Sequence, residues 1–381
     1  MKKLVIAANS FKECADSVTI ARYFMEGLVG KTGMKLISRP ISDGGDGFLN
    51  VCKEYYSLEI LKYRVSTPYN DKKIIAKAGY DKQKKIIYIE SADILGLKVI
   101  PKAHRHPISL SSKGMGDLLK GILKDIKSKK IRVKKLVIGI GGTGINDLGL
   151  GMCSVLGLKL FDNNSNELQI IPKNFQDASS LIWGGFNAPF KIEVILDVKN
   201  PLLGKNGSTY VFGKQKGLTS NEMRGIESGF EKIINILKYN KLKQLPNEIS
   251  GAGGGLAAGF VLFLNASAKS SEKFILEDLG LRRINNPAFV LLTEGAFDKQ
   301  SLMGKASGCL MEHFSKEGSQ IILCSGKVDK SVIKMLPKDA KVIELRKYFK
   351  SEKESIKNIH KGIKLASVQV LKFITNSTEL T

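Results

Sequence analysis

The sequence has few of the residues that mark disulfide-rich, zinc-binding or membrane proteins. It contains 5 cysteines and 4 histidines in 381 residues. The cysteines are scattered and form no C-x-x-C pair, which argues against a disulfide framework or a zinc site and favours a reducing compartment. Apolar runs are too short for a membrane span, and the apolar start is too short for a signal peptide. We therefore expect a cytoplasmic protein without a membrane contact.

The standard short motifs of nucleotide-binding and hydrolytic enzymes are also absent. There is no G-x-x-x-x-G-K-[ST], no G-x-S-x-G and no H-E-x-x-H, so a P-loop, a serine hydrolase and a zinc protease are disfavoured. The glycines Gly141, Gly142 and Gly144 do not follow the G-x-G-x-x-G spacing of dinucleotide-binding loops. His104 and His106 flank an arginine in a basic loop and are expected at the surface.

Acidic residues are too few to balance the basic ones, and the formal net charge is +24. The lysines spread along the whole chain, with dense runs at 124–135 and 347–364. Neither run is interleaved with aromatic residues, as a single-strand nucleic-acid platform would be. We interpret the charge as a solvated surface that favours anionic small substrates, without a specific nucleic-acid partner.

What the sequence does contain is a succession of buried strands followed by polar, glycine-rich loops. Predicted strands cover 3–8, 36–40, 136–140, 193–198, 289–293 and 320–324. Helical patterns cover 17–29, with Ser17 as the N-cap, and 48–55, 115–126 and 221–239. Alternating segments between 63 and 90 indicate antiparallel pairing. The pattern predicts an α/β protein whose ligands bind at the carboxyl ends of the strands.

The stretch 135–150 shows this pattern most clearly. A buried strand runs into Gly141, Gly142, Thr143 and Gly144, and Asn146 and Asp147 follow at once. Backbone amides in such a glycine turn can bind a phosphate, although a tight turn with a helix cap is an equal alternative for one loop alone. A second glycine-rich loop occupies 250–255.

Several strand ends carry carboxylates and glycines, and one lysine, Lys12, follows the first strand. These groups are the ones that phosphoryl transfer requires. Cations and amides neutralise phosphates, carboxylates hold Mg²⁺, and one carboxylate can accept the proton of an attacking hydroxyl. For any single aspartate a turn or a cap is the commoner role, but five or six such strand ends favour phosphoryl transfer.

Several segments, in their order along the chain, resemble the motifs of the bacterial-type glycerate kinase family. These segments are N-S-F-K at 9–12, S-D-G-G-D-G at 42–47, G-G-T-G-I-N-D at 141–147, D-V-K-N-P-L-L-G at 197–204, F-G-K-Q-K-G at 212–217, G-A-G-G-G at 251–255, E-G-A-F-D-K-Q-S at 294–301 and G-K-A at 304–306. The resemblance covers nearly the whole chain. It departs at Asn9, where the family has aspartate, and at Ala296, where it has arginine. Either change could alter substrate preference or turnover.

The resemblance implies a two-domain α/β protein that closes over a cleft and transfers a phosphoryl group from ATP to D-glycerate, giving 2-phosphoglycerate. Residues 1–66 and 287–381 would form a Rossmann-like three-layer domain, and 67–286 an inserted second α/β domain. ATP and Mg²⁺ would be the cofactors, and a homodimer is left open. The alternatives are a kinase of a related hydroxy acid and a non-catalytic descendant that binds an anion.

Roles for individual residues follow as hypotheses from the same resemblance. Lys12, Asp43 and Asp197 would be catalytic, with Asp43 and Asp197 as the Mg²⁺ ligands and Asp197 preferred as the base. Expected to bind substrate or phosphate are Asn9, Ser10, Gly44, Gly45, Gly141, Gly142, Thr143, Asn146, Asp147, Gly251, Gly253, Gly254, Gly255, Glu294, Asp298 and Ser301.

Overall fold

A computed structural model of the chain describes residues 1–11, 14–196, 198, 200–239, 249–302 and 305–379. Two compact units account for these residues. The first comprises Met1–Asp43, Lys53–Tyr55 and Ser271–Thr381, and the second comprises Gly44–Cys52 and Tyr56–Ser270. The domain boundaries expected near 66 and 287 stay a proposal.

The first unit is built on a parallel five-stranded sheet in the order β13-β12-β11-β1-β2. Its strands are β1 (Lys3–Ala8), β2 (Lys35–Ser38), β11 (Phe289–Phe297), β12 (Gln320–Val328) and β13 (Lys341–Glu344). Its helices are α1 (Ser17–Leu28), α9 (Ser271–Lys273), α10 (Lys299–Leu302), α11 (Ala306–Lys316), α12 (Glu352–Lys357) and α13 (Ile359–Glu379).

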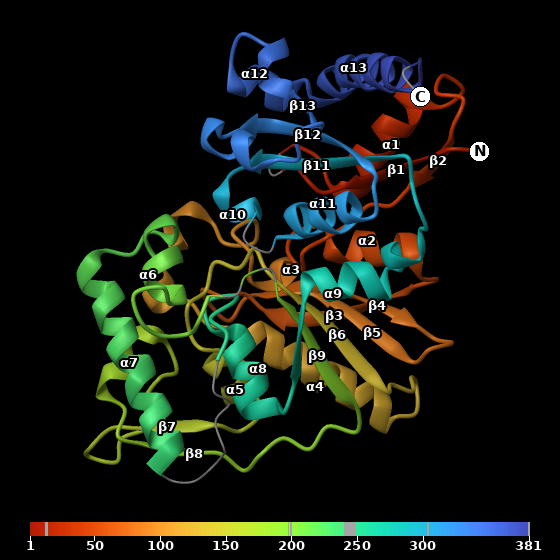
Figure 1. Cartoon of the computed structure of the whole chain (residues 1–381). Coiled ribbons are helices and arrows are strands. Elements are labelled where there is room, and N and C mark those ends of the chain that lie inside the picture. The colour runs from red at the N-terminus through yellow and green to blue at the C-terminus, as the bar shows by residue number, and fades with distance from the viewer. Residues whose placement is uncertain (12–13, 197, 199, 240–248, 303–304, 380–381) are drawn as a thin grey trace. The chain divides into compact units, whose positions relative to one another are not determined.

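Helices cover both faces of this sheet, because successive residues of each buried strand point to opposite sides. On one face Leu4 and Ile6 pack against Phe24 of α1 and Ile363 of α13. On the other face lies α11, which contacts β11 and β12 (Figure 1). The predicted α/β fold is confirmed, with three layers in this unit.

The second unit contains a mixed six-stranded sheet in the order β10-β9-β6-β5-β4-β3. Its strands are β3 (Glu59–Ser66), β4 (Lys73–Asp81), β5 (Ile86–Glu90), β6 (Lys135–Ile140), β9 (Lys191–Leu196) and β10 (Ser267–Ser270), and a separate pair is formed by β7 (Lys159–Phe161) and β8 (Ser180–Ile182). Its helices are α3 (Ala92–Leu95), α4 (Lys113–Lys127), α5 (Leu150–Val155), α6 (Ser208–Phe212), α7 (Ser220–Tyr239) and α8 (Leu256–Leu264). Helix α2 (Phe48–Tyr55) contributes its first residues to this unit.

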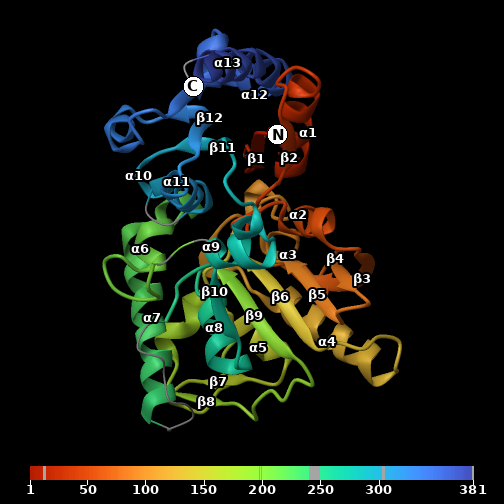
Figure 2. The ribbon, with the colours of Figure 1, turned by 45° about the vertical axis from the view of Figure 1, so that its right-hand side comes forward.

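One continuous core joins this sheet to its helices. Leu136 and Ile138 of β6 share it with Leu118 of α4, Met152 of α5 and Phe260 of α8. Figure 2 shows β3, β4, β5, β6 and β9 side by side in the sheet. The antiparallel pairing predicted between 63 and 90 is confirmed by the ladders of β3 with β4 and of β4 with β5.

Some predicted element ends need correction. The N-cap of α1 is Asp16, whose side chain accepts a hydrogen bond from the Thr19 amide, and Ser17 is the first helical residue. Strand β11 continues through Phe297 instead of ending at Thr293, because it pairs with β12 as far as Val328. Glu294 therefore lies within a strand and not on the loop after it. Within the described ranges, no helix combines the length and apolar character of a membrane span.

Candidate active site

The first unit gathers predicted site residues at the carboxyl edge of its parallel sheet. The ends of β1 and β11 are tied together by Thr293, whose hydroxyl accepts a hydrogen bond from the Asn9 amide and donates one to the Asn9 carbonyl, both at 2.9 Å. The Asn9 side-chain oxygen accepts from the Ser10 amide at 2.8 Å. The Asn9 side chain therefore stabilises the turn in which it lies. Thr293, which the sequence motifs did not single out, joins this turn to β11.

Glu294 is the most unusual group at this edge. Its residue is 8% exposed, and its Oε2 atom has no hydrogen-bond partner among the described residues. Burial raises the pKa of Glu294 to about 7, the Lys305 ammonium opposes this rise, and the nearby Asp43 carboxylate adds to it. A buried carboxylate with an unbonded oxygen, beside another carboxylate and a lysine, is typical of a functional site.

Asp298 and Ser301 form a reciprocal cap at the start of α10. The Ser301 amide donates to Asp298 Oδ1 at 3.1 Å, and the Asp298 amide donates to the Ser301 hydroxyl at 3.2 Å. Ser301 is fully buried. Both residues thus fix the chain that follows β11, and a direct contact of either with substrate stays a prediction.

The second unit carries the loop that follows β6, and Asp147 anchors it from inside. Asp147 is fully buried. Its Oδ2 accepts hydrogen bonds from the amide and hydroxyl of Ser112, at 2.6 and 2.8 Å, and from the Gly151 amide at 3.2 Å, while its Oδ1 accepts from the Gly149 amide at 3.1 Å. Burial raises the pKa of Asp147, and these bonds oppose the rise. We therefore propose an internal anchoring role for Asp147 in place of the substrate contact expected from the sequence.

The two predicted glycine loops, 141–147 and 251–255, pack on each other. A Cβ on Gly254 would lie 2.1 Å from the Ile145 carbonyl oxygen, and its φ of +68° favours glycine independently. The same Ile145 carbonyl accepts a hydrogen bond from the Lys216 ammonium at 2.8 Å. Asn146 donates to the Thr209 hydroxyl at 3.2 Å. Close contact between the loops therefore explains the glycine at 254 without a ligand.

Two hydroxyls beside these loops are left without a partner. Thr143 Oγ1 and Ser208 Oγ are buried and have no hydrogen-bond partner among the described residues. A Cβ on Gly253 would lie 3.6 Å from Thr143 Oγ1, and one on Gly251 would lie 2.9 Å from Ser208 Oγ. Unbonded buried hydroxyls call for an explanation, and a ligand that bears phosphate oxygens would satisfy them.

Glu90 supports the third loop of this unit, which contains Gly44 and Gly45. Its two carboxylate oxygens accept hydrogen bonds from the amides of Gly47 and Leu49, both at 3.0 Å, at the start of α2. Burial raises the pKa of Glu90 to about 7 against these two bonds. The sequence motifs did not single out Glu90, although its place at the carboxyl end of β5 was a usable signal.

Lys12 and Asp197 lie outside the described residues, so their roles stay predictions. No group of three or more His, Cys, Asp or Glu residues suited to a metal occurs within the described ranges. Mg²⁺ needs only one or two carboxylates when substrate phosphates complete its shell. The neighbouring carboxylates of Asp43 and Glu294, the latter with an unbonded oxygen, fit such an ion.

Comparisons with known proteins point to one family. A glycerate 2-kinase of Escherichia coli K12 is 30% identical over 311 residues, which cover 80% of this chain and 79% of that protein. A glycerate kinase of Neisseria meningitidis serogroup B is 29% identical over 309 residues, which cover 80% of each chain. The crystal structure of a proposed glycerate kinase 2 from Salmonella typhimurium LT2 has the same fold, with a TM-score of 0.76 at 23% identity over 99% of both chains. The model of the glycerate kinase family matches residues 4–375, and the chain therefore belongs to that family.

Proposed function

We propose that the protein transfers the γ-phosphoryl group of ATP to D-glycerate and forms 2-phosphoglycerate and ADP. The C2 hydroxyl oxygen would attack the γ-phosphorus, the bond from that phosphorus to the β,γ-bridging oxygen would break, and the hydroxyl proton would pass to a base. Family membership supports the substrates. The observation that supports the chemistry is the buried Glu294 with its unbonded oxygen, close to Asp43 and Lys305.

The residues would divide this work between metal binding, proton transfer and charge neutralisation. Asp43 and Asp197 are the proposed Mg²⁺ ligands, and Glu294, whose carboxylate lies near Asp43, is a further candidate ligand. The ion would supply charge neutralisation on the phosphates when bound. Asp197 is the proposed base, and Lys12 would neutralise a phosphate or the glycerate carboxylate. Lys305 joins this set because its charge acts on Glu294.

The loops of the second unit would bind phosphate oxygens. The hydroxyls of Thr143 and Ser208 are buried donors without a partner among the described residues. Gly141 and Gly142 would contribute backbone amides after the end of β6, and the Gly141 amide would exchange its 3.4 Å bond to the Ser91 hydroxyl for the ligand. Asp147 and Glu90 would act indirectly in this proposal. Their carboxylates accept hydrogen bonds that position the loops, and neither carboxylate contacts the ligand.

Asp197→Asn should lower kcat by about 10²-fold or more, the usual size of a general-base contribution. The amide keeps the shape of the side chain but cannot take the proton. The check is steady-state turnover with saturating ATP and D-glycerate. Turnover like that of the parent protein would eliminate Asp197 as the base.

A related hydroxy acid is the alternative substrate, because Asn9 and Ala296 depart from the family motifs. A coupled assay of ADP release over D-glycerate, other 2,3-dihydroxy acids and simple 2-hydroxy acids tests this directly. We expect the highest kcat/KM with D-glycerate, and a higher value for another acid would shift the proposal to that acid.

The proposal includes a cytoplasmic location, which the free cysteines support.

A further inference from the structure

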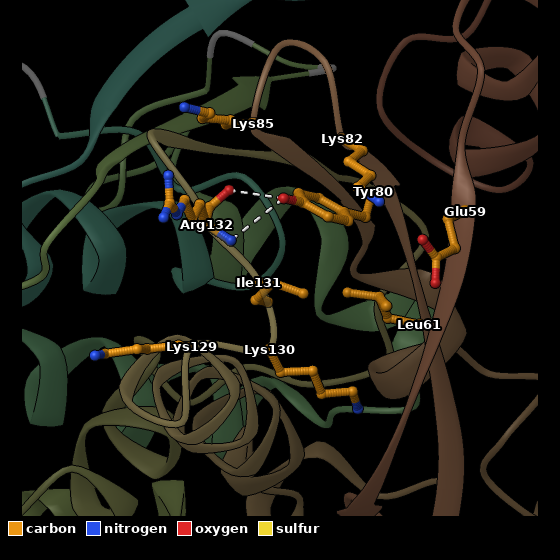
Figure 3. Close-up of a pocket in the computed structure, with 9 residues that line it drawn as sticks. All are labelled: Glu59, Leu61, Tyr80, Lys82, Lys85, Lys129, Lys130, Ile131 and Arg132. Carbon is orange, nitrogen blue, oxygen red and sulfur yellow. Dashed lines mark hydrogen bonds between the residues drawn. The ribbon is translucent and has the colours of Figure 1, made fainter.

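A basic pocket lies on the second unit at the end of the sheet where β5 and β6 begin. Its volume is about 420 Å³. Five cationic side chains line it, namely Lys82, Lys85, Lys129, Lys130 and Arg132 (Figure 3). The glycine loop of residues 141–147 follows the other end of β6, roughly 20 Å away along a six-residue strand. The pocket is therefore separate from the phosphate-binding loops proposed above.

Two chain segments build the pocket and are fixed against each other. Lys82 and Lys85 belong to the turn between β4 and β5, and Lys129 to Arg132 connect α4 to β6. The Tyr80 hydroxyl donates to the Arg132 carbonyl at 2.8 Å and accepts from the Arg132 amide at 3.3 Å. Figure 3 shows these two bonds between the segments. These two hydrogen bonds therefore hold together the two segments that carry the cationic side chains.

The charge of the pocket is poorly balanced by the protein. Lys82, Lys85, Lys129 and Arg132 form no ion pair with any described residue, and Lys130 approaches Asp125 at 3.6 Å. Glu59 is the one carboxylate among the lining residues. In the view of Figure 3, Lys85, Lys129 and Arg132 extend to one side of the Tyr80 ring. The ammonium groups of Lys82 and Lys130 lie toward the other side, where Glu59 is the single carboxylate beside them. Like charges gathered without counter-charges repel one another and favour a bound anion.

Two of the pocket lysines have an unusual backbone conformation. Lys85 and Lys129 have φ of 59° and 61°, in the left-handed region that favours glycine. Lysine at both positions carries a conformational cost that glycine would avoid. In spite of this cost, the chain places the side chains of both lysines at the pocket.

We propose that this pocket binds a small organic molecule that carries two or more phosphate groups. Arginine and lysine together suit phosphate oxygens, which the guanidinium can bind through two parallel hydrogen bonds. The apolar atoms of Leu61, Ile131 and the Tyr80 ring line the same pocket and would contact a carbon skeleton. The volume lies at the small end of the range for ligand pockets, which fits a compact molecule better than a nucleic-acid strand.

The test uses inorganic tripolyphosphate as the probe and calorimetric titration of the full-length protein. The phosphate-binding loops proposed above would bind the same probe, so the titration is fitted to two sites, and hydrogen exchange assigns the one at the pocket. The pocket variant is Lys82→Gln with Lys129→Gln and Arg132→Gln. The matched control is Lys62→Gln with Arg64→Gln and Lys77→Gln, which removes the same three charges from the exposed side of β3 and β4. All six side chains are exposed, so both variants should keep the fold, and circular dichroism verifies this.

We expect the pocket variant to bind tripolyphosphate at least 10-fold more weakly than the parent protein, and the control variant to change by less than 3-fold. Tripolyphosphate should also slow amide hydrogen exchange in 80–85 and 129–135 of the parent protein. Equal weakening in both variants, or none in the pocket variant, would overturn the proposal. The three pocket substitutions could instead weaken the binding of single-stranded RNA more than that of tripolyphosphate. That result would also overturn the proposal, in favour of a nucleic-acid site. Neither readout requires kinase activity.

Discussion

Glu294→Gln is expected to lower kcat by about 10²-fold or more and, at the same time, to change how stability depends on pH. Glutamine keeps the size of the side chain but removes the charge that faces Asp43 and Lys305. Loss of one preorganised charged group at a reacting centre commonly costs this much in turnover. Turnover with ATP and D-glycerate measures the first effect.

The stability effect follows from the pKa of about 7 that Glu294 has in the folded protein, against 4.5 as its ordinary value. Between these two values the folded state binds more protons than the unfolded state, so the free energy of unfolding of the parent protein falls as pH rises. The ionisation of Glu294 lowers the free energy of unfolding by about 3 kcal/mol in total, and this decrease is complete above pH 7. The variant lacks this loss, so its stability relative to the parent protein should rise by about 3 kcal/mol between pH 4.5 and 8.

Urea unfolding at several pH values measures this difference, and the contribution of Glu90 cancels because both proteins retain it. Glu312→Gln is the matched control, since Glu312 is an exposed residue of the neighbouring helix α11. It should leave kcat and the pH dependence almost unchanged. A Glu294→Gln variant with parental turnover and a parental pH profile would contradict the proposed role of this carboxylate.

Asp147→Ala should destabilise the second unit by about 4 kcal/mol or more. The substitution leaves four buried donors, on Ser112, Gly149 and Gly151, without their acceptor. Each unsatisfied buried donor costs about 1–3 kcal/mol, although neighbouring groups relax in part. Asp147→Asn keeps one carbonyl acceptor and should lie between the alanine variant and the parent protein.

Urea unfolding again gives the measurement, and Asp162→Ala is the control. Asp162 accepts hydrogen bonds from the amides of Asn164 and Asn166 in a similar local pattern, but it is exposed to water. Its loss should be much smaller, because water replaces the lost acceptor. Equal effects at the two positions would mean that Asp147 is not a buried anchor.

Local sequence patterns predicted most of the fold. The span of β1 matches the predicted range because it is a short apolar segment between Lys2 and Asn9. The span of α2 matches because its apolar residues gather on one buried face after Gly47. Strand β11 was predicted too short because Glu294 and Gly295 resemble a loop, whereas its partner β12 extends the ladder as far as Phe297. Pairing over long sequence distances decided where this strand ends.

The site was predicted less completely than the fold. Motifs located the loops of residues 42–47, 141–147 and 251–255, but they could not separate a ligand contact from an internal brace. Asp147 is an example, because only its neighbours in space reveal that both of its oxygens are occupied. Glu90 and Thr293 were missed for the same reason, since each supports a segment that lies far away in sequence.

Phosphorus NMR of a reaction that contains the protein, ATP, Mg²⁺ and D-glycerate tests the proposed activity most directly. We expect the γ-phosphate signal of ATP to be replaced by a phosphomonoester signal split by one proton, as phosphate on C2 requires. A signal split by two protons would place the phosphate on C3 and contradict the proposed regiochemistry. No new phosphomonoester, with protein shown to be folded by circular dichroism, would contradict the proposed glycerate kinase activity itself.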